Sequence, residues 1–152
     1  MRCTLRVAHL ESKPAYKVGD KITRGMKIGR MGNTGKSTAA HAHMDVVDGV
    51  VRKHFYLSDM FVKMRPNKRQ LDYFIDNELF GVRPVITVEY DCPKYKKTQG
   101  VRHPAYDVVP FNRHQTTDNF DIFWNRSKEG TVELILDNDV GYGHCIYISF
   151  EC

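Results

Sequence analysis

A regular alternation of polar and apolar side chains in AHAHMDVV is the sequence feature that most constrains the fold. Over residues 41 to 46, histidine and aspartate alternate with alanine, methionine and valine. Successive side chains of a β-strand point to opposite faces, so a period of two predicts a strand rather than a helix. His41, His43 and Asp45 then share a polar face, and the apolar residues between them face the other way.

The segment before this strand contains GKST, which is part of the phosphate-binding loop of nucleotide-binding proteins. The full motif is G-x-x-x-x-G-K-S/T, but Arg30 stands where the first glycine should be. The loop should also lead directly into a helix, whereas the alternation predicts a strand. The sequence therefore does not favour nucleotide binding, and Lys36 is not expected to hold a phosphate.

Length and composition indicate one folded domain. The chain has 152 residues, of which 41% are hydrophobic, enough for one core but too few for two comfortable domains. No apolar run approaches the roughly 20 residues of a membrane span, so no membrane association is expected. The net charge of +5 favours anionic partners such as cell-wall polymers. Nucleic acid is not predicted as a partner, because arginine-rich blocks and aromatic-interleaved RNA motifs are absent from the sequence.

The cysteines and the N-terminal segment bear on the cellular compartment. The four cysteines show neither C-x-x-C spacing nor the density of a secreted disulfide framework, so free thiols are expected. The opening segment MRCTLRVAHLESK lacks the apolar core of a secretory signal. We therefore expect synthesis in the cytoplasm without a signal peptide.

The overall pattern predicts a mainly β fold of the α+β class, a single domain of antiparallel sheets with one helix. Short alternating segments such as TLRVAHL, VITVEY, GTVELILDN and HCIYISFEC read as strands. One segment shows helical spacing and predicts a helix over about 68–80, with Asn67 and Gln70 as a capping box and Gly81 as a stop. Its apolar face consists of Leu71, Phe74, Ile75 and Leu79.

Two pairs of residues have the spacing of metal ligands. His41 and His43 point to the same face of a strand, so one can bind a metal while the other reaches its water. In HPAYD, His103 and Asp107 can converge on one ion from a proline-bent loop. Two imidazoles and a carboxylate leave a fourth position for water, as in catalytic zinc sites. Each pair taken alone also has a plainer interpretation as part of a polar surface.

A longer pattern surrounds the two histidines. It comprises Gly19-Asp20, Gly25, Ile28-Gly29, Gly32-Asn33-Thr34-Gly35, Ser37-Thr38 and His41-Ala42-His43, with the AHL of Ala8 to Leu10 upstream. This pattern resembles the signature of the lysostaphin/LytM-type zinc endopeptidases, which cut the peptide cross-links of peptidoglycan. The resemblance implies that His43 binds zinc and that His41 and His9 are catalytic.

The resemblance has its two halves in swapped order. In the family an H-x-x-x-D motif precedes H-x-H and supplies the other two zinc ligands, but here HPAYD lies downstream, which implies His103 and Asp107. Residues 1–48 would then be the family's C-terminal half, 103–152 its N-terminal half and 49–102 a connecting segment. Joined end to end, GYGHCIYISFEC and MRCTLRVAHL predict one β-hairpin, as in a circular permutant. Hairpin tips tolerate new termini well.

Some positions depart from the family pattern without removing a ligand or a catalytic histidine. The departures are Val7, Ala40, Ala42, Met44, Ala105 and His144. The apolar positions among them shape the substrate groove in the family.

The function that the resemblance implies is zinc-dependent hydrolysis of peptidoglycan cross-links by a bacteriophage lysin or a virion-associated wall-degrading enzyme. The expected cofactor is one Zn²⁺ and the expected partners are peptidoglycan peptides. An alternative from another class is a catalytically inactive structural or wall-binding module of a phage particle. The sequence leaves open whether one chain completes the site or two chains exchange half-domains.

Overall fold

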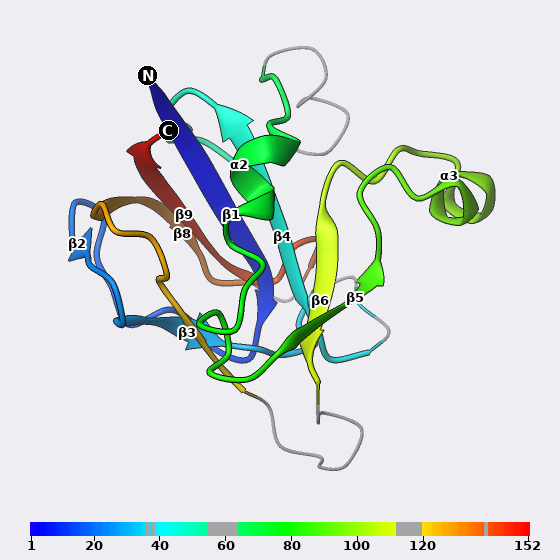
Figure 1. The fold of residues 1–152 in the computed structure, drawn as a ribbon, viewed down its shortest axis with the longest axis horizontal. Coiled ribbons are helices and arrows are strands. Elements are labelled where there is room, and N and C mark those ends of the chain that lie inside the picture. Colours follow the sequence, from blue (N-terminus) through cyan, green and yellow to red (C-terminus); the bar gives the residue numbers. More distant parts are fainter. Residues whose placement is uncertain (36, 38, 55–63, 112–119, 139) are drawn as a thin grey trace.

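The computed structural model describes residues 1–35, 37, 39–54, 64–111, 120–138 and 140–152 (Figure 1). Antiparallel strands form one seven-stranded sheet in the order β2-β8-β9-β1-β4-β6-β5, and β3 pairs with β7 in a small second sheet. The predicted class, a mainly β single domain of antiparallel sheets, is confirmed. The strands are β1 (Arg2–Leu10), β2 (Lys21–Ile22), β3 (Lys27–Arg30), β4 (Ala42–Asp48), β5 (Pro84–Val88), β6 (Tyr106–Pro110), β7 (Asp121–Phe123), β8 (Gly130–Leu136) and β9 (His144–Glu151).

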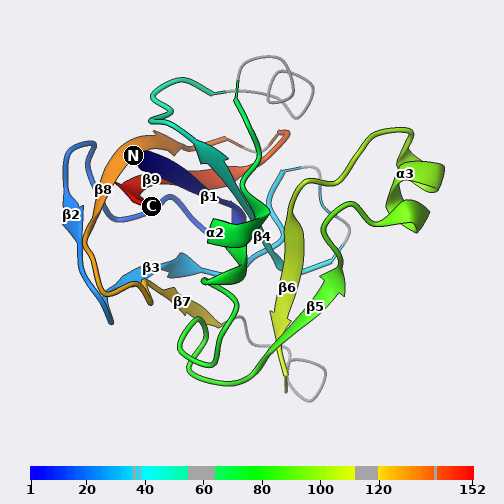
Figure 2. The same cartoon turned by 45° about the horizontal axis from the view of Figure 1, so that its top comes forward.

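The two ends of the chain meet in the middle of the large sheet. Strands β1 and β9 are antiparallel neighbours, with Arg2 opposite Glu151, and the amide of Cys152 donates to the carbonyl of Met1 at 3.1 Å. Both views in Figures 1 and 2 show the termini side by side. The hairpin predicted across the termini is therefore present, with its tip open.

The prediction of free thiols is wrong for two of the four cysteines. Cys3 and Cys152 form a disulfide with a Cα–Cα distance of 5.7 Å, while Cys92 and Cys145 are free. The pairing follows from the β1–β9 register, which brings residues from opposite ends of the chain within bonding range. Cysteine spacing along the sequence carries no sign of this proximity.

The two central strands β1 and β4 have differently composed faces. On one face Leu5, Val7, Met44 and Val46 enter the main hydrophobic core. This core also holds an aromatic cluster in which the rings of Phe74, Trp124 and Phe150 pack edge to face. We call this side of the sheet the core face. The opposite side, the site face, has a smaller hydrophobic cluster that includes Ala8 and Val47, and it also carries buried polar residues: Thr4, Arg6, His43 and Asp45.

The helix predicted over 68–80 is shorter than expected. Helix α2 covers only Lys68–Asp72, although Asn67 caps it as predicted by accepting from the amide of Gln70. Beyond it the chain turns instead of continuing as a helix, and the Asp76 carboxylate accepts from the amide of Glu78. Such a local side-chain bond competes with helical hydrogen bonding. Helix α2 lies beside β4 (Figure 2), and three of the four residues of the predicted apolar face are nevertheless buried, Leu71, Phe74 and Leu79.

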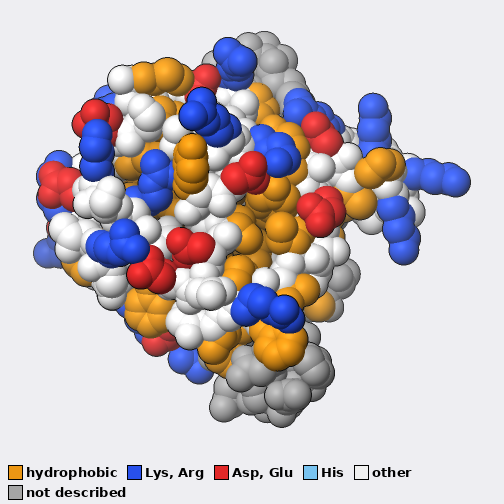
Figure 3. Space-filling model, in the orientation of Figure 1, with side chains coloured by type: hydrophobic (Ala, Val, Ile, Leu, Met, Phe, Trp, Pro, Cys, Tyr) orange, Lys and Arg blue, Asp and Glu red, His pale blue; other side chains and the backbone are white. Residues whose placement is uncertain are grey.

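A second helix, α3 (Pro93–Gln99), is present in addition to the single helix that the sequence predicted. Pro93 occupies its first turn, and Gly100 ends it in a left-handed conformation with φ of 77°. None of its residues is buried, and Lys and Arg side chains project around it (Figure 3). Within the described part of the chain, no helix is long and apolar enough to cross a membrane.

Candidate metal centre

The predicted metal ligands come together where β4 and β6 run side by side. His43 lies directly opposite Asp107 in the β4–β6 register, and His103 precedes β6 by a short turn. The ligand atoms of His43, His103 and Asp107 all lie within 4.8 Å of one another. Asp107 Oδ1 is 3.1 Å from His43 Nδ1 and 3.4 Å from His103 Nε2. These three residues could hold a metal ion, as predicted.

The hydrogen bonds of His103 fit metal binding. Its Nδ1 lies 3.1 Å from the backbone carbonyl of Glu89, which can only accept, so Nδ1 carries the proton. The Nε2 atom therefore has the lone pair, and this buried atom has no hydrogen-bond partner among the described residues. Buried polar groups without partners are rare in folded proteins. A metal ion would give this nitrogen a partner and make use of its lone pair.

Close packing of charges perturbs the ionisation of the ligands. Burial disfavours the charged form of His43, but hydrogen bonds to Asp107 and Asp45 outweigh it and raise its pKa to about 9. Burial also opposes ionisation of Asp107, yet the neighbouring imidazoles of His103 and His43 hold its pKa well below the ordinary value. The metal-free site thus stabilises a carboxylate beside a protonated imidazole, and a cation at the same place would replace that proton.

His41 and His9, the two predicted catalytic histidines, lie at the edge of this group. His41 Nε2 is 3.7 Å from Asp107 Oδ1, while its Nδ1 is 2.7 Å from the carbonyl of Ala39. The ring centroids of His9 and His41 are 5.1 Å apart, and those of His9 and His43 are 5.9 Å apart. All five residues predicted for the site therefore converge within one chain.

A β-bulge in β1 places His9 on the site face. The β1–β9 register shifts between Val7 and Leu10, and His9 has a left-handed backbone with φ of 60°. Strict alternation after Val7 would have put His9 in the core, but Leu10 takes that place. Burial and the neighbouring His43 lower the pKa of His9 to about 4, which keeps the ring neutral at neutral pH.

The glycine turn before H-x-H fixes the orientation of His9. The Nδ1 of His9 donates to the carbonyl of Thr34 at 2.6 Å, so its Nε2 holds a lone pair. Gly35 has φ of 73°, and a Cβ there would collide with the backbone of Gly141 and Gly143 in the turn before β9. Glycine is needed here for close contact between two turns, a role unrelated to phosphate. Lys36 lies outside the described residues.

The sequence did not predict that two further residues of the site face belong to the site. Arg6 and Asp45 are buried side by side, with Arg6 Nη2 donating to Asp45 Oδ2 at 2.6 Å. The same oxygen lies 3.2 Å from His43 Nε2. The alternation did place Asp45 on the polar face with His43, but a lone arginine in β1 carried no comparable signal.

The remaining described histidines lie outside the ligand group, as predicted. His144 pairs with Asp137 at 2.9 Å, and His54 Nδ1 is 3.2 Å from the hydroxyl of Tyr147. His114 lies outside the described residues.

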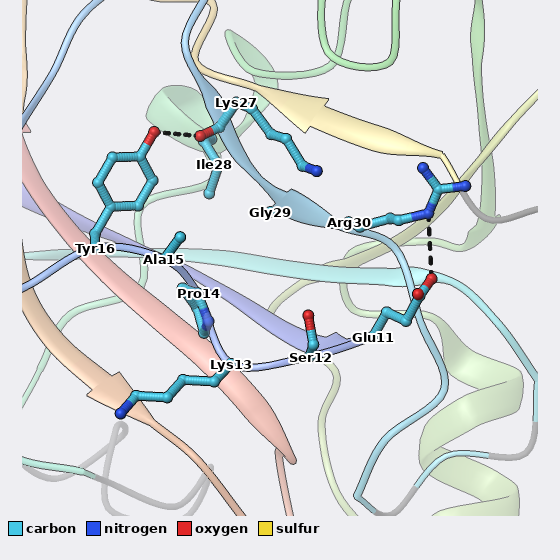
Figure 4. Close-up of a pocket in the computed structure, with 10 residues that line it drawn as sticks. All are labelled: Glu11, Ser12, Lys13, Pro14, Ala15, Tyr16, Lys27, Ile28, Gly29 and Arg30. Carbon is cyan, nitrogen blue, oxygen red and sulfur yellow. Dashed lines mark hydrogen bonds and ion pairs between the residues drawn. The ribbon is translucent and has the colours of Figure 1, made fainter.

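A surface pocket lies next to the end of β1 but does not include the candidate metal ligands. Residues 11–16, which follow β1 directly, and residues 27–30 line it (Figure 4). Two of its basic side chains are paired, since Arg30 contacts Glu11 and Lys27 contacts Asp121 at 3.2 Å each. The pocket contains none of the five predicted site residues.

Comparison with known proteins adds no relative. No protein-family model matches the chain, and neither a curated protein nor a solved structure gives a match.

Proposed function

We propose that this protein is a zinc-dependent endopeptidase that hydrolyses peptide cross-links of bacterial peptidoglycan. The observation that carries the proposal is the convergence of a three-residue ligand group with two further imidazoles, those of His9 and His41. The sequence resemblance to the lysostaphin/LytM-type endopeptidases supplies the substrate class. A phage lysin or virion-associated enzyme is the biological setting that we propose for it.

The donor set favours zinc over the hard cations. Two imidazole nitrogens and one carboxylate oxygen are a usual set for catalytic zinc, whereas calcium and magnesium prefer oxygen ligands throughout. His43, His103 and Asp107 would hold the ion. Bound zinc supplies a Lewis acid that activates water near neutral pH and polarises a peptide carbonyl.

His9 and His41 provide the proton chemistry in this proposal. Each ring uses Nδ1 to contact a backbone carbonyl, of Thr34 and Ala39 respectively. With Nδ1 as the donor to that carbonyl, Nε2 of the ring has a lone pair that can accept a proton from water. Once protonated, the same nitrogen can donate to the oxyanion or to the leaving amine.

The swapped order of the two halves is part of the proposal. Strands β9 and β1 form the hairpin that a circular permutant would have opened, and their ends are linked through Cys3 and Cys152. Because one chain supplies all five site residues, we propose that the monomer is active. Activity that falls on dilution would favour exchange of half-domains instead.

The test combines zinc content with hydrolysis of purified cell walls. Protein prepared without chelator should contain about one zinc per chain, measured by elemental mass spectrometry, and should release peptides from walls. The His103→Ala variant should lose both properties. The matched control is His144→Ala, a histidine outside the ligand group, which should keep both.

Two outcomes would contradict the proposed enzymatic function. If the folded wild-type protein takes up no zinc, even when zinc is added, the proposed zinc site is wrong. Zinc binding without wall hydrolysis would favour the structural or wall-binding module instead.

A further inference from the structure

A buried ion pair lies behind the ligand group and is not used by the proposed proton chemistry. Arg6 in β1 and Asp45 in β4 are register partners, and each side chain is only 1% exposed. Arg6 donates to Asp45 Oδ2 from Nη2 at 2.6 Å and from Nε at 3.1 Å. Taking two charges out of water is costly, so such a pair is weak evidence of a stabilising role. Its position suggests another use.

Asp45 connects this pair to the metal ligand. Its Oδ2 atom lies 3.2 Å from His43 Nε2, while His43 Nδ1 faces Asp107 at 3.1 Å. A neutral imidazole has one N–H and one lone pair, and a carboxylate only accepts. In the metal-free site both nitrogens of His43 face a carboxylate. When Nδ1 binds a cation, Asp45 accepts from the proton on Nε2 and so favours the tautomer whose lone pair lies on Nδ1, on the side of Asp107.

Arg6 is itself held from several sides. Its Nη1 donates to the hydroxyl of Tyr147 at 3.2 Å, and its guanidinium lies 3.9 Å above the ring of Tyr142. The Tyr142 ring in turn lies beside His43, with 5.7 Å between centroids. The carboxylate of Asp45 is thus fixed by a rigid partner, and it cannot turn away from His43 without leaving a buried charge unpaired.

We infer that Arg6 and Asp45 form a positioning unit that fixes His43 as a metal ligand through Nδ1, so that zinc affinity depends on the Asp45 carboxylate. The inference rests on the metal site of the proposed function. Outer-shell carboxylates that accept from a metal-bound histidine fix its tautomer and increase its basicity. Neither Arg6 nor Asp45 would touch the metal or the substrate.

The first measurement is the zinc dissociation constant of Asp45→Asn, determined by competition with a chromophoric chelator. The amide keeps the shape of the side chain but removes its charge, and we expect binding to weaken by about 10- to 100-fold. Asp48→Asn is the matched control, because Asp48 lies on the same strand and is hydrogen-bonded to Asn67. It should bind zinc as the wild type does.

The second measurement does not depend on a variant that folds. Nitrogen-15 NMR of zinc-loaded wild-type protein should show His43 with a protonated Nε2 and a metal-bound Nδ1. Metal bound at Nε2 would overturn the inference, as would an unchanged affinity in Asp45→Asn. Equal weakening in Asp45→Asn and Asp48→Asn would also overturn it, because the loss would then be a general effect on the strand.

The outcomes separate this inference from the proposed function. If wild-type protein binds no zinc, the metal site and the inference both fail. If wild-type protein binds zinc and Asp45→Asn matches it, only the positioning role is wrong. If Asp45→Asn binds weakly and the NMR assignment agrees, the inference holds whether or not the protein cuts cell walls.

Discussion

The core face and the site face of β1 and β4 are built from the same strands but follow different rules. On the core face, Leu5, Val7, Met44 and Val46 alternate regularly and are completely or almost completely buried. The site face also buries Ala8 and Val47 in a second, smaller hydrophobic cluster, but beside them lie buried charged residues that have specific partners, as Arg6 has Asp45. Apolar contacts are non-directional, whereas buried polar groups need particular partners in particular places.

This difference teaches where the chain can change. The core face tolerates apolar substitutions that conserve volume, because burial depends mainly on area and packing. The site face tolerates little, since removing one partner leaves another buried group unsatisfied. Neighbouring residues of a single strand should therefore respond to mutation in separable ways.

The largest effect is expected at His43 on the site face. His43→Ala removes a ligand, so zinc affinity should fall by more than the roughly 100-fold that loss of an outer-shell partner costs. Wall hydrolysis should disappear with it. Zinc titration and wall digestion measure the two effects, and retention of one zinc per chain in this variant would exclude His43 as a ligand.

The next residue, Met44, tests the core face of the same strand. Met44 is fully buried in the main core. Met44→Ala should lower the free energy of unfolding by about 2–5 kcal/mol, because it leaves a cavity. At temperatures where the variant stays folded, it should still bind one zinc. Urea denaturation measures the loss of stability. Loss of zinc from a folded Met44→Ala protein would contradict the claim that substitutions on the core face leave zinc binding unchanged.

The disulfide between Cys3 and Cys152 gives a second test of the core face, at the end of β1 away from the ligand group. Cys3 belongs to the main core and is bonded to Cys152 across the open hairpin. Cys152→Ser should lower the free energy of unfolding by about 2–4 kcal/mol, since the unfolded chain is no longer closed into a loop. Cys92→Ser, at a free cysteine, should change it little. Zinc affinity should stay the same in both variants, and equal stabilities would contradict the prediction.

The site face should also respond to pH. The pKa of His43 is raised from 6.5 to about 9 in the metal-free protein, so zinc must displace a proton below that pH. Zinc affinity should rise up to about tenfold per pH unit between pH 7 and 9, which equals about 1.4 kcal/mol. The same proton stabilises the metal-free fold fully below pH 6.5, and this contribution is lost as the pH rises through about 9.

Calorimetric titration with zinc in two buffers of different ionisation enthalpy measures the protons released on binding. We expect about one proton per zinc near pH 7.5 from His43. An affinity that does not change from pH 7 to 9 would show that His43 is already neutral in the metal-free protein.

Alternation allowed the sequence to predict much of the sheet and part of the site. It placed His43 and Asp45 on one face of a strand, and the structure has them there. The pairing of β1 with β9 was predicted from the family resemblance, by joining the two ends of the sequence into one hairpin. The pairing of His43 with Asp107 depends on the β4–β6 register, which joins distant segments and is not encoded in local spacing.

Most of what the sequence did not predict depends on local backbone conformation, which the hydrophobic pattern does not report. Helical spacing from Leu71 to Leu79 reported burial correctly, but turn-forming bonds such as that of Asp76 ended the helix early. Helix α3 had its proline and glycine signals, yet without an apolar face it resembled ordinary charged surface. The bulge at His9 has no local signal either, because a histidine in a left-handed conformation is uncommon.

The smallest expected effect on stability concerns this bulge, where β1 passes from one face to the other. His9 has φ of 60°, where a side chain with a Cβ is strained and glycine is not. His9→Gly and His9→Ala both remove the imidazole and its bond to Thr34, so they differ mainly in the backbone. We expect His9→Gly to be more stable than His9→Ala by about 1 kcal/mol, and both to keep zinc but lose wall hydrolysis. Urea denaturation compares them directly. If His9→Ala is as stable as His9→Gly, the backbone has relaxed and the bulge depends on the histidine itself. If His9→Gly is more stable, the chain holds a strained residue at the position where regular alternation would have buried it in the core.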